Sequence, residues 1–186
     1  KTTGNSNTVA GANFLGTADN QPLELSVNSQ RALRLEPNTN SPNLIGGFSG
    51  NYVTNAATGA FIGGGGASVV FGVSGLNRVT DDFGVVGGGA DNRAGSTNAN
   101  PTDAYYATVA GGVHNIAEGI ATFVGGGAEN RAANNNTTIA GGYQNNASGY
   151  ISTIGGGYQN TNVGYISAIG GGRRNFIGIP ADQSTI

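Results

Sequence analysis

A fifteen-residue period runs through the second half of the sequence and limits the folds that this chain can adopt. An aliphatic residue recurs at this interval, and an asparagine follows each one six residues later. The aliphatic positions are Val109, Val124, Ile139, Ile154 and Ile169, and the asparagines are Asn115, Asn130, Asn145, Asn160 and Asn175. Helix-turn-helix repeats need more than about thirty residues. Fifteen residues can hold two short strands and two turns, so the period predicts an all-β solenoid, a parallel β-roll.

The same phase continues upstream, interrupted by insertions. Ile62 and Asn77 lie nine residues further apart than the repeat requires, and the step from Val86 to Val109 is eight residues longer than one period. Insertions that preserve the phase of a solenoid belong at its rim. We therefore predict one continuous roll domain over residues 41–178.

Glycines follow every aliphatic position, as in Gly155–Gly157, and the chain has 35 of them. A coil this short buries little, and a row of glycines lets another backbone approach closely. These features predict packing of identical chains around an axis. Within each chain we expect the aliphatic row to form the core ladder and the asparagine row to form a turn ladder, hydrogen-bonded from coil to coil.

One coil carries a family resemblance. The segment Ile154–Ala168, Ile-Gly-Gly-Gly-Tyr-Gln-Asn-Thr-Asn-Val-Gly-Tyr-Ile-Ser-Ala, resembles the head repeat of trimeric autotransporter adhesins of the YadA type. That resemblance implies a homotrimeric, left-handed parallel β-roll that binds host matrix or surfaces. The family's usual repeat has fourteen residues and a serine-valine-alanine-isoleucine-glycine core. We therefore expect strand pairing to carry over, and ligand specificity not to.

Residues 1–40 form a different segment. Leucines and a valine alternate with polar residues over 22–37, which predicts half-buried strands, and Asn28–Gln30 suits a hairpin loop. We expect this hairpin to cap the N-terminal end of the roll. The stretch Asn13–Thr17, with Asp19–Leu23 and Arg31–Arg34, resembles phage-type tail-fibre proteins, which also form trimeric fibres.

The composition excludes several classes of function. Only 10% of the residues are charged and the net charge is -2, so no basic patch for nucleic acid is expected. The chain has no cysteine and no apolar run long enough to span a membrane. We predict no catalytic residue, no cofactor and no resident metal.

Two features are candidate exceptions to this prediction. His114 is the only histidine, and unrelated residues fill its slot in sister coils, which predicts a solvated rim position. The adjacent Asp81 and Asp82 are compatible with a calcium site, but a solvated turn is the favoured interpretation.

The C-terminal part, residues 179–186, is predicted to be a tail or a connection. Phe176, Ile177 and Ile179 are more apolar than their counterparts one coil earlier, which predicts an end-to-end contact. The C-terminal face should continue into a further domain or dock onto the next trimer as a filament. Thr8–Gly11 repeats the Thr-Val-Ala-Gly of the roll and could receive that end.

These features together predict a structural, fibrous surface protein of adhesin or tail-fibre type. Its expected partners are its own copies and an unidentified surface ligand such as host matrix or a glycan. Its expected location is extracellular, at a cell surface or on a virion-like fibre. An alternative is an ice- or mineral-binding solenoid, suggested by a hydroxyl-bearing row just before the aliphatic positions: Thr108, Thr122, Thr137, Ser152 and Ser167. A solenoid polysaccharide lyase or hydrolase ranks third, because the chain lacks clustered carboxylates.

Overall fold

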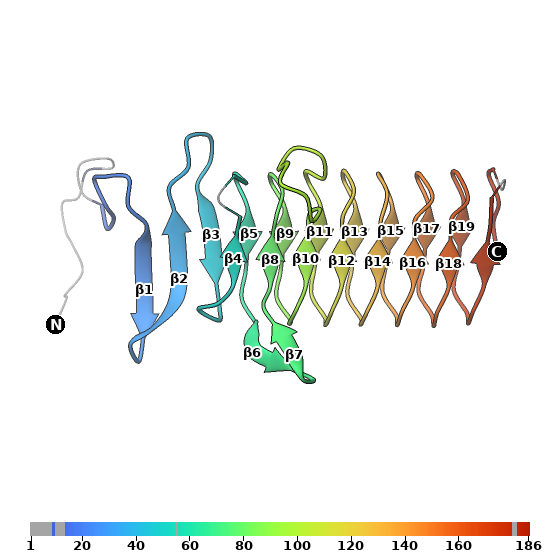
Figure 1. Ribbon diagram of the computed structural model, residues 1–186, viewed down its shortest axis with the longest axis horizontal. Helices are drawn as coiled ribbons and strands as arrows, with labels where there is room; N and C mark the ends of the chain where they lie inside the picture. The colour runs from blue at the N-terminus through green and yellow to red at the C-terminus, as the bar shows by residue number, and fades with distance from the viewer. Residues whose placement is uncertain (1–8, 10–13, 55, 180–181) are drawn as a thin grey trace.

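The computed structural model describes residues 9, 14–54, 56–179 and 182–186, and this part of the chain contains strands and turns but no helix. Figure 1 shows a row of stacked coils that runs from a hairpin near the N-terminus to the C-terminal end. Two sheets form the opposite faces of the roll. The predicted all-β parallel solenoid is confirmed.

Ten strands make the first sheet and eight make the second. The ten-stranded sheet contains β1 (Leu23–Val27), β2 (Gln30–Glu36), β3 (Asn43–Gly46), β5 (Phe61–Ile62), β9 (Val85–Val86), β11 (Thr108–Val109), β13 (Phe123–Val124), β15 (Thr138–Ile139), β17 (Thr153–Ile154) and β19 (Ala168–Ile169). The eight-stranded sheet contains β4 (Tyr52–Val53), β8 (Arg78–Val79), β10 (Arg93–Ala94), β12 (Ile116–Ala117), β14 (Arg131–Ala132), β16 (Asn146–Ala147), β18 (Thr161–Asn162) and β20 (Phe176–Ile177). A separate antiparallel pair, β6 (Ala67–Val70) and β7 (Val73–Gly75), forms an arm.

The coils pair in parallel with the fifteen-residue register. Val124 lies opposite Ile139 in one sheet, and Ala132 lies opposite Ala147 in the other. The strands of the regular coils, β8 to β20, are only two residues long because the chain must turn twice within every coil. The strands are therefore stabilised by stacking along the roll and not by their own length.

The aliphatic row forms the core. Each member of the core ladder is fully buried, namely Val109, Val124, Ile139, Ile154 and Ile169. Alanines of the eight-stranded sheet face this ladder, and they are fully buried at Ala117, Ala132 and Ala147. Asn162 replaces the alanine in the next coil and is also fully buried. Its amide is satisfied by Ser167, whose hydroxyl donates to Asn162 Oδ1 at 2.5 Å and whose carbonyl accepts from Nδ2 at 3.0 Å.

The asparagine row links the coils at one turn. Asn130 is representative: its backbone N–H donates to Asn115 Oδ1 at 3.0 Å, and its Nδ2 donates to the carbonyls of Gly126 and Gly142. The same bonds recur at Asn145 and Asn160. A buried amide that serves its own coil and both neighbours leaves no polar atom unpaired, which explains why asparagine recurs there.

Both insertions lie at the rim of the roll. The extra residues between Ile62 and Asn77 form the β6–β7 arm, which extends away from the stacked coils in Figure 1. The second insertion is a loop between β10 and β11. Neither insertion disturbs the stacking, because β5 pairs with β9 and β9 pairs with β11 in the same register as the later coils.

The N-terminal hairpin extends the ten-stranded sheet, since β2 pairs antiparallel with β3. Its loop is Asn28–Ser29, one residue shorter than predicted, and both residues have positive φ. The hairpin leucines are less buried than expected, with Leu25 45% and Leu35 36% exposed. Leu35 lies opposite Leu44, whose neighbour Ile45 points into the core. The leucines therefore lie on the outer face of the sheet, where Leu15, Pro37 and Pro42 line a shallow pocket with Leu23 and Leu35 but leave Leu35 36% exposed.

Candidate functional site

From β8 onward each coil turns at two corners, and each corner holds a non-glycine residue in the left-handed conformation. The first corner leads from the ten-stranded to the eight-stranded sheet, and the second leads back. We call these sets the first and second corner rows. The first comprises Asp91, His114, Glu129, Gln144, Gln159 and Arg174, and the second comprises Phe83, Tyr106, Ala121, Asn136, Ile151, Ile166 and Gln183.

The second corner row presents exposed apolar side chains under backbone strain. Ile151 and Ile166 have φ of 54° and 47° and are about two-fifths exposed. A β-branched residue is unusual in this conformation, which costs roughly 1–2 kcal/mol. The same conformation recurs at the other corners of the roll, so the turn itself requires it, and Ile151 and Ile166 are held there with their apolar side chains exposed.

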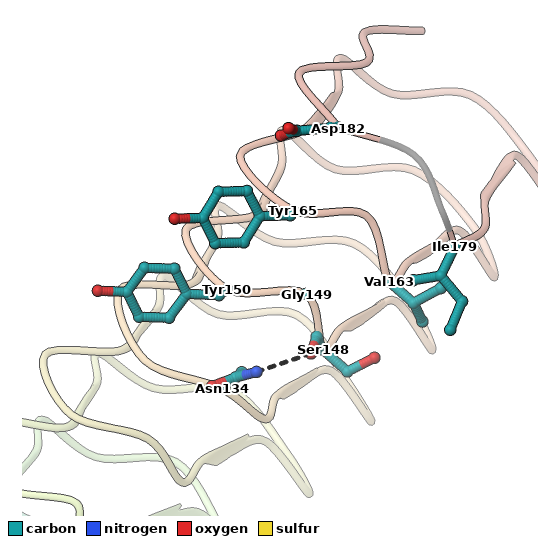
Figure 2. Close-up of a pocket in the computed structure, with 8 residues that line it drawn as sticks. All are labelled: Asn134, Ser148, Gly149, Tyr150, Val163, Tyr165, Ile179 and Asp182. Atoms are coloured by element: carbon teal, nitrogen blue, oxygen red, sulfur yellow. Dashed lines mark hydrogen bonds between the residues drawn. The ribbon is translucent and has the colours of Figure 1, made fainter.

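Two tyrosines stand beside these isoleucines. The rings of Tyr150 and Tyr165 stack with centroids 5.5 Å apart and planes 13° from parallel. Figure 2 shows both rings projecting from successive coils, with their hydroxyls directed outward. A shallow cavity of about 410 Å³ lies next to them, and Val163, Ile179 and Asp182 also line it. The stacked tyrosines and the cavity beside them form one candidate contact surface.

The first corner row is a chain of polar side chains. Arg78 donates to Asp91 Oδ1 at 2.8 Å, and His114 Nδ1 lies 2.6 Å from Asp91 Oδ2. Further along, Glu129 accepts a hydrogen bond from Gln144. A second stacked pair, Tyr143 and Tyr158, lies beside this row with ring centroids 5.5 Å apart.

The structure corrects the prediction for His114. Its side chain is only 21% exposed and has a fixed carboxylate partner in Asp91, so it is not a freely solvated rim residue. The sequence contained the necessary signal, because Asp91 and His114 occupy the same slot in stacked coils. Catalysis by a histidine also requires a group that reacts with substrate. No nucleophile is hydrogen-bonded to His114 among the residues that the structure describes.

A groove of about 670 Å³ lies between the arm and the first corner. Phe71 and Val73 of the arm form one side, and Val113, Ala128 and Tyr143 continue around it. The polar groups at its edge come from the first corner row, namely Asp91, His114 and Glu129. The groove combines aromatic walls with a few hydrogen-bonding groups, which is the usual composition of a ligand site.

Asp81 was predicted to lie in a solvated turn, and this is wrong. Its side chain is fully buried, and its carboxylate accepts from the backbone N–H groups of Ser96 at 2.7 Å and Ala104 at 3.1 Å. Burial raises the pKa of the Asp81 carboxyl above its ordinary value. Asp82 instead accepts from the backbone of Thr58. The two carboxylates therefore hold different backbone segments and do not converge on a cation.

The hydroxyl-bearing row of the ice-binding alternative also lies elsewhere than that hypothesis requires. Its members in phase with the repeat are buried, namely Thr122, Thr137, Ser152 and Ser167. Thr108 is one position out of phase and lies half-buried in strand β11. Thr122 donates to the Gly119 carbonyl at 2.9 Å, so that hydroxyl stabilises a turn. A buried row cannot meet an ice or mineral surface.

The predicted end-to-end residues have different environments. Ile177 is 4% exposed and belongs to the core, so it is not free for an end contact. Phe176 and Ile179 are 64% and 80% exposed. Residues 182–186 form another rung on β19: the N–H of Ala168 donates to Ser184 and that of Gly170 donates to Ile186. Ser184, Thr185 and Ile186 repeat the Ser-Thr-Ile sequence of residues 152–154, so the sequence already indicated an additional rung here. Thr8, Ala10 and Gly11 lie outside the described residues.

Among the described residues, no group of three or more histidine, cysteine, aspartate or glutamate side chains could hold a metal ion. The same residues include no helix with the length and hydropathy needed to cross a membrane. Neither a protein-family model nor a curated protein sequence matches the chain. Its function has to be inferred from its own surfaces.

Proposed function

We propose that this chain is a structural, non-enzymatic subunit of a homotrimeric surface fibre, in which the roll forms the rod and the corners contact a surface ligand. The observation that carries this proposal is the outer face of the ten-stranded sheet. One row of side chains follows that face through every strand: Leu23, Leu35, Leu44, Phe61, Val85, Thr108, Phe123, Thr138, Thr153 and Ala168. None of these residues is charged.

The hairpin places its leucines on this same outer face. Leu23 pairs with Leu35 across the strands, while Glu24 pairs with Arg34 on the other side, where a 2.8 Å ion pair joins them. A soluble hairpin normally turns its apolar side toward its own core. Here the charged side faces the direction of the core and the leucines face outward, which is expected if another chain covers the leucines.

The outer face of the eight-stranded sheet differs, because its row of side chains includes the charged residues Arg78, Arg93 and Arg131. Glu118 lies between Arg93 and Arg131 and forms an ion pair with each. Burial lowers the pKa of Arg93, and the nearby Glu118 carboxylate opposes that shift. Charged residues are depleted at the centre of protein interfaces. The contrast between the two sheets favours the ten-stranded face as the contact between copies.

A row of glycines beside this face supports the same conclusion. The middle residue of each small-residue triplet meets open space, or nothing nearer than a carbonyl at 3.9 Å, where a side chain would project. Gly126 and Gly156 have φ of 150° and 149°, whereas Gly88, Gly111 and Gly171 have no positive φ. The fold of one chain therefore gives no reason for glycine at these last three positions. Close approach of the backbone of a second chain would explain why glycine occurs there.

The trimeric state and the adhesin or tail-fibre role come from the resemblance of the repeat and of the N-terminal segment. An extracellular location, at a cell surface or on a virion-like fibre, belongs to the same proposal. A head-to-tail filament remains a further part of it, with Phe176 and Ile179 as the exposed apolar residues at the C-terminal end. The ice-binding alternative has lost the hydroxyl row that suggested it.

Light scattering at micromolar concentration tests the assembly directly. We expect the mass of three chains of 18.5 kDa each. A folded particle with the mass of one or two chains would contradict the trimer.

A matched pair of substitutions tests which face mediates assembly. Thr153 lies on the outer face of the ten-stranded sheet, and Thr161 lies one strand later on the outer face of the other sheet. Thr153→Asp should shift the mass toward the monomer, because symmetry brings a carboxylate from every chain into the apolar contact. Thr161→Asp should leave the mass unchanged. Equal behaviour of the two variants would argue against this interface.

A further inference from the structure

The side chains of the first corner row are joined from coil to coil by hydrogen bonds, and we call this series the polar ladder. It is interrupted once. On one side, Arg78 and His114 both contact Asp91. On the other side the ladder runs without a gap from Glu129 through Gln144 and Gln159 to Arg174, with hydrogen bonds of 2.6, 2.7 and 3.0 Å. Among the described residues, no hydrogen bond joins His114 to Glu129, although they occupy successive coils of this row. The groove between the arm and the corner lies at this interruption.

Both groups at the interruption are hydrogen-bond acceptors. The Asp91 carboxylate can only accept, so His114 Nδ1 must donate to it. With Nδ1 occupied as the donor, Nε2 is the ring nitrogen left for a ligand, and it accepts a hydrogen bond in the neutral form of the imidazole. Glu129 also accepts, since Tyr143 Oη donates to Oε1 at 3.2 Å and Gln144 Nε2 donates to Oε2 at 2.6 Å. A ligand that bridges the interruption must therefore donate at least two hydrogen bonds.

The rest of the groove is apolar and aromatic. Val113 and Ala128 belong to successive coils at this corner, and Phe71 of the arm is 85% exposed beside them. The Tyr143 ring is 37% exposed and continues into Tyr158 of the next coil. A molecule with an apolar face and adjacent hydroxyl donors matches this arrangement, because aromatic rings pack against the apolar face while fixed acceptors orient the hydroxyls.

The charge of the groove further limits the class of ligand that it can bind. Asp91 is balanced by Arg78, with 2.8 Å between the guanidinium and the carboxylate. Glu129 forms no ion pair among the residues that the structure describes, and its hydrogen bond raises the pKa of the Tyr143 hydroxyl. The site thus carries an unbalanced negative charge. An acidic sugar would be repelled, whereas a neutral one would not.

We infer that the groove between Phe71 and Tyr143 binds a neutral, extended β-1,4-linked glycan, whose hydroxyls donate to His114 Nε2 and Glu129 while a sugar ring packs on Tyr143. This inference rests on the proposed role as a surface-binding fibre and specifies its ligand. The coils repeat about every 4.8 Å along the roll, which is similar to the length of one sugar in an extended chain. Successive sugars can therefore meet successive coils, with Tyr158 as the next aromatic surface.

Isothermal titration calorimetry on the whole chain tests the inference, with cellohexaose, chitohexaose and mannohexaose as neutral probes and hexagalacturonate as the acidic one. We expect at least one neutral hexasaccharide to bind and the acidic one not to. Tyr143→Ala should weaken that binding about tenfold. Tyr52→Ala is the matched control, since Tyr52 is similarly exposed, at 42%, and lies in β4 on the outer face of the eight-stranded sheet, outside the groove and both corner rows. It should leave the affinity within about twofold of the parent.

Three outcomes would overturn the inference. They are the absence of binding by all three neutral probes at millimolar concentration, equal weakening by Tyr143→Ala and Tyr52→Ala, and salt-sensitive binding of polylysine in place of the glycans. Light scattering of each protein separates this result from the proposed assembly. A monomer that binds glycan through Tyr143 would contradict the trimer and retain the groove. A trimer that binds no neutral probe would support the proposed assembly and contradict the proposed glycan site.

Discussion

Ile154→Asp is expected to prevent the roll from folding around its central coils. Ile154 is fully buried, with Ile139 and Ile169 stacked on either side of it in the core ladder. The one amide that faces the ladder in this coil, Asn162, already donates to the carbonyls of Thr153 and Ser167, and no ion pair in the described residues involves this coil. A carboxylate at this position would therefore lose its hydration without compensation. The expected loss of stability exceeds about 4 kcal/mol per chain, among the largest single-residue effects. Circular dichroism during thermal unfolding measures it.

Ile151→Asp provides the control within the same coil. This residue is 39% exposed and has a φ of 54°, so the new carboxylate stays in water. Aspartate also tolerates the left-handed conformation better than a β-branched residue does. We expect the midpoint of unfolding to stay the same or to rise slightly. A parent-like midpoint for Ile154→Asp would show that the core ladder does not support the fold.

The sequence was sufficient to predict the parts of the fold that repeat. A period of fifteen specifies which residues stack, so the burial of Val124 and the coil-to-coil bonds of Asn130 follow from the pattern. The insertions could be placed for the same reason, since only a rim position leaves the phase unchanged. Periodicity carries this information because every coil experiences the same environment.

The features that depend on a single long-range contact were harder to predict. Alternation in the hairpin indicated strands but not which face they turn outward. That depends on the antiparallel register that places Leu35 opposite Leu44. Asp81 was misjudged because the groups that bury it, the N–H groups of Ser96 and Ala104, come from an insertion that occurs only once. The groove likewise depends on the arm and on the missing hydrogen bond between His114 and Glu129. Each of these features occurs once in the described residues, so the period does not predict it.

Gly112→Ala is expected to cause the other large loss of stability. Comparing it with Gly111→Ala, at the adjacent glycine, separates the folding of the coil from the assembly of the chains. Gly112 has a φ of +87°, and a Cβ there would overlap the backbone carbonyl of Gly127 in the next coil. Gly112→Ala therefore combines an unfavourable backbone conformation with a clash that no side-chain movement can relieve. We expect it to destabilise the chain by about 2–4 kcal/mol, visible as a lower thermal midpoint.

Gly111→Ala adds the same methyl group one residue earlier, where it meets open space within the chain. The coil should keep its β-sheet circular dichroism, because neither backbone conformation nor neighbouring coils oppose the change. If this row is the close contact between copies, the added methyl group should instead lower the mass measured by light scattering as the protein is diluted. An equal loss of β-structure in both variants would contradict the distinction. Retention of the full mass by Gly111→Ala would place the contact between chains away from this glycine row and on the leucine and phenylalanine side of the sheet.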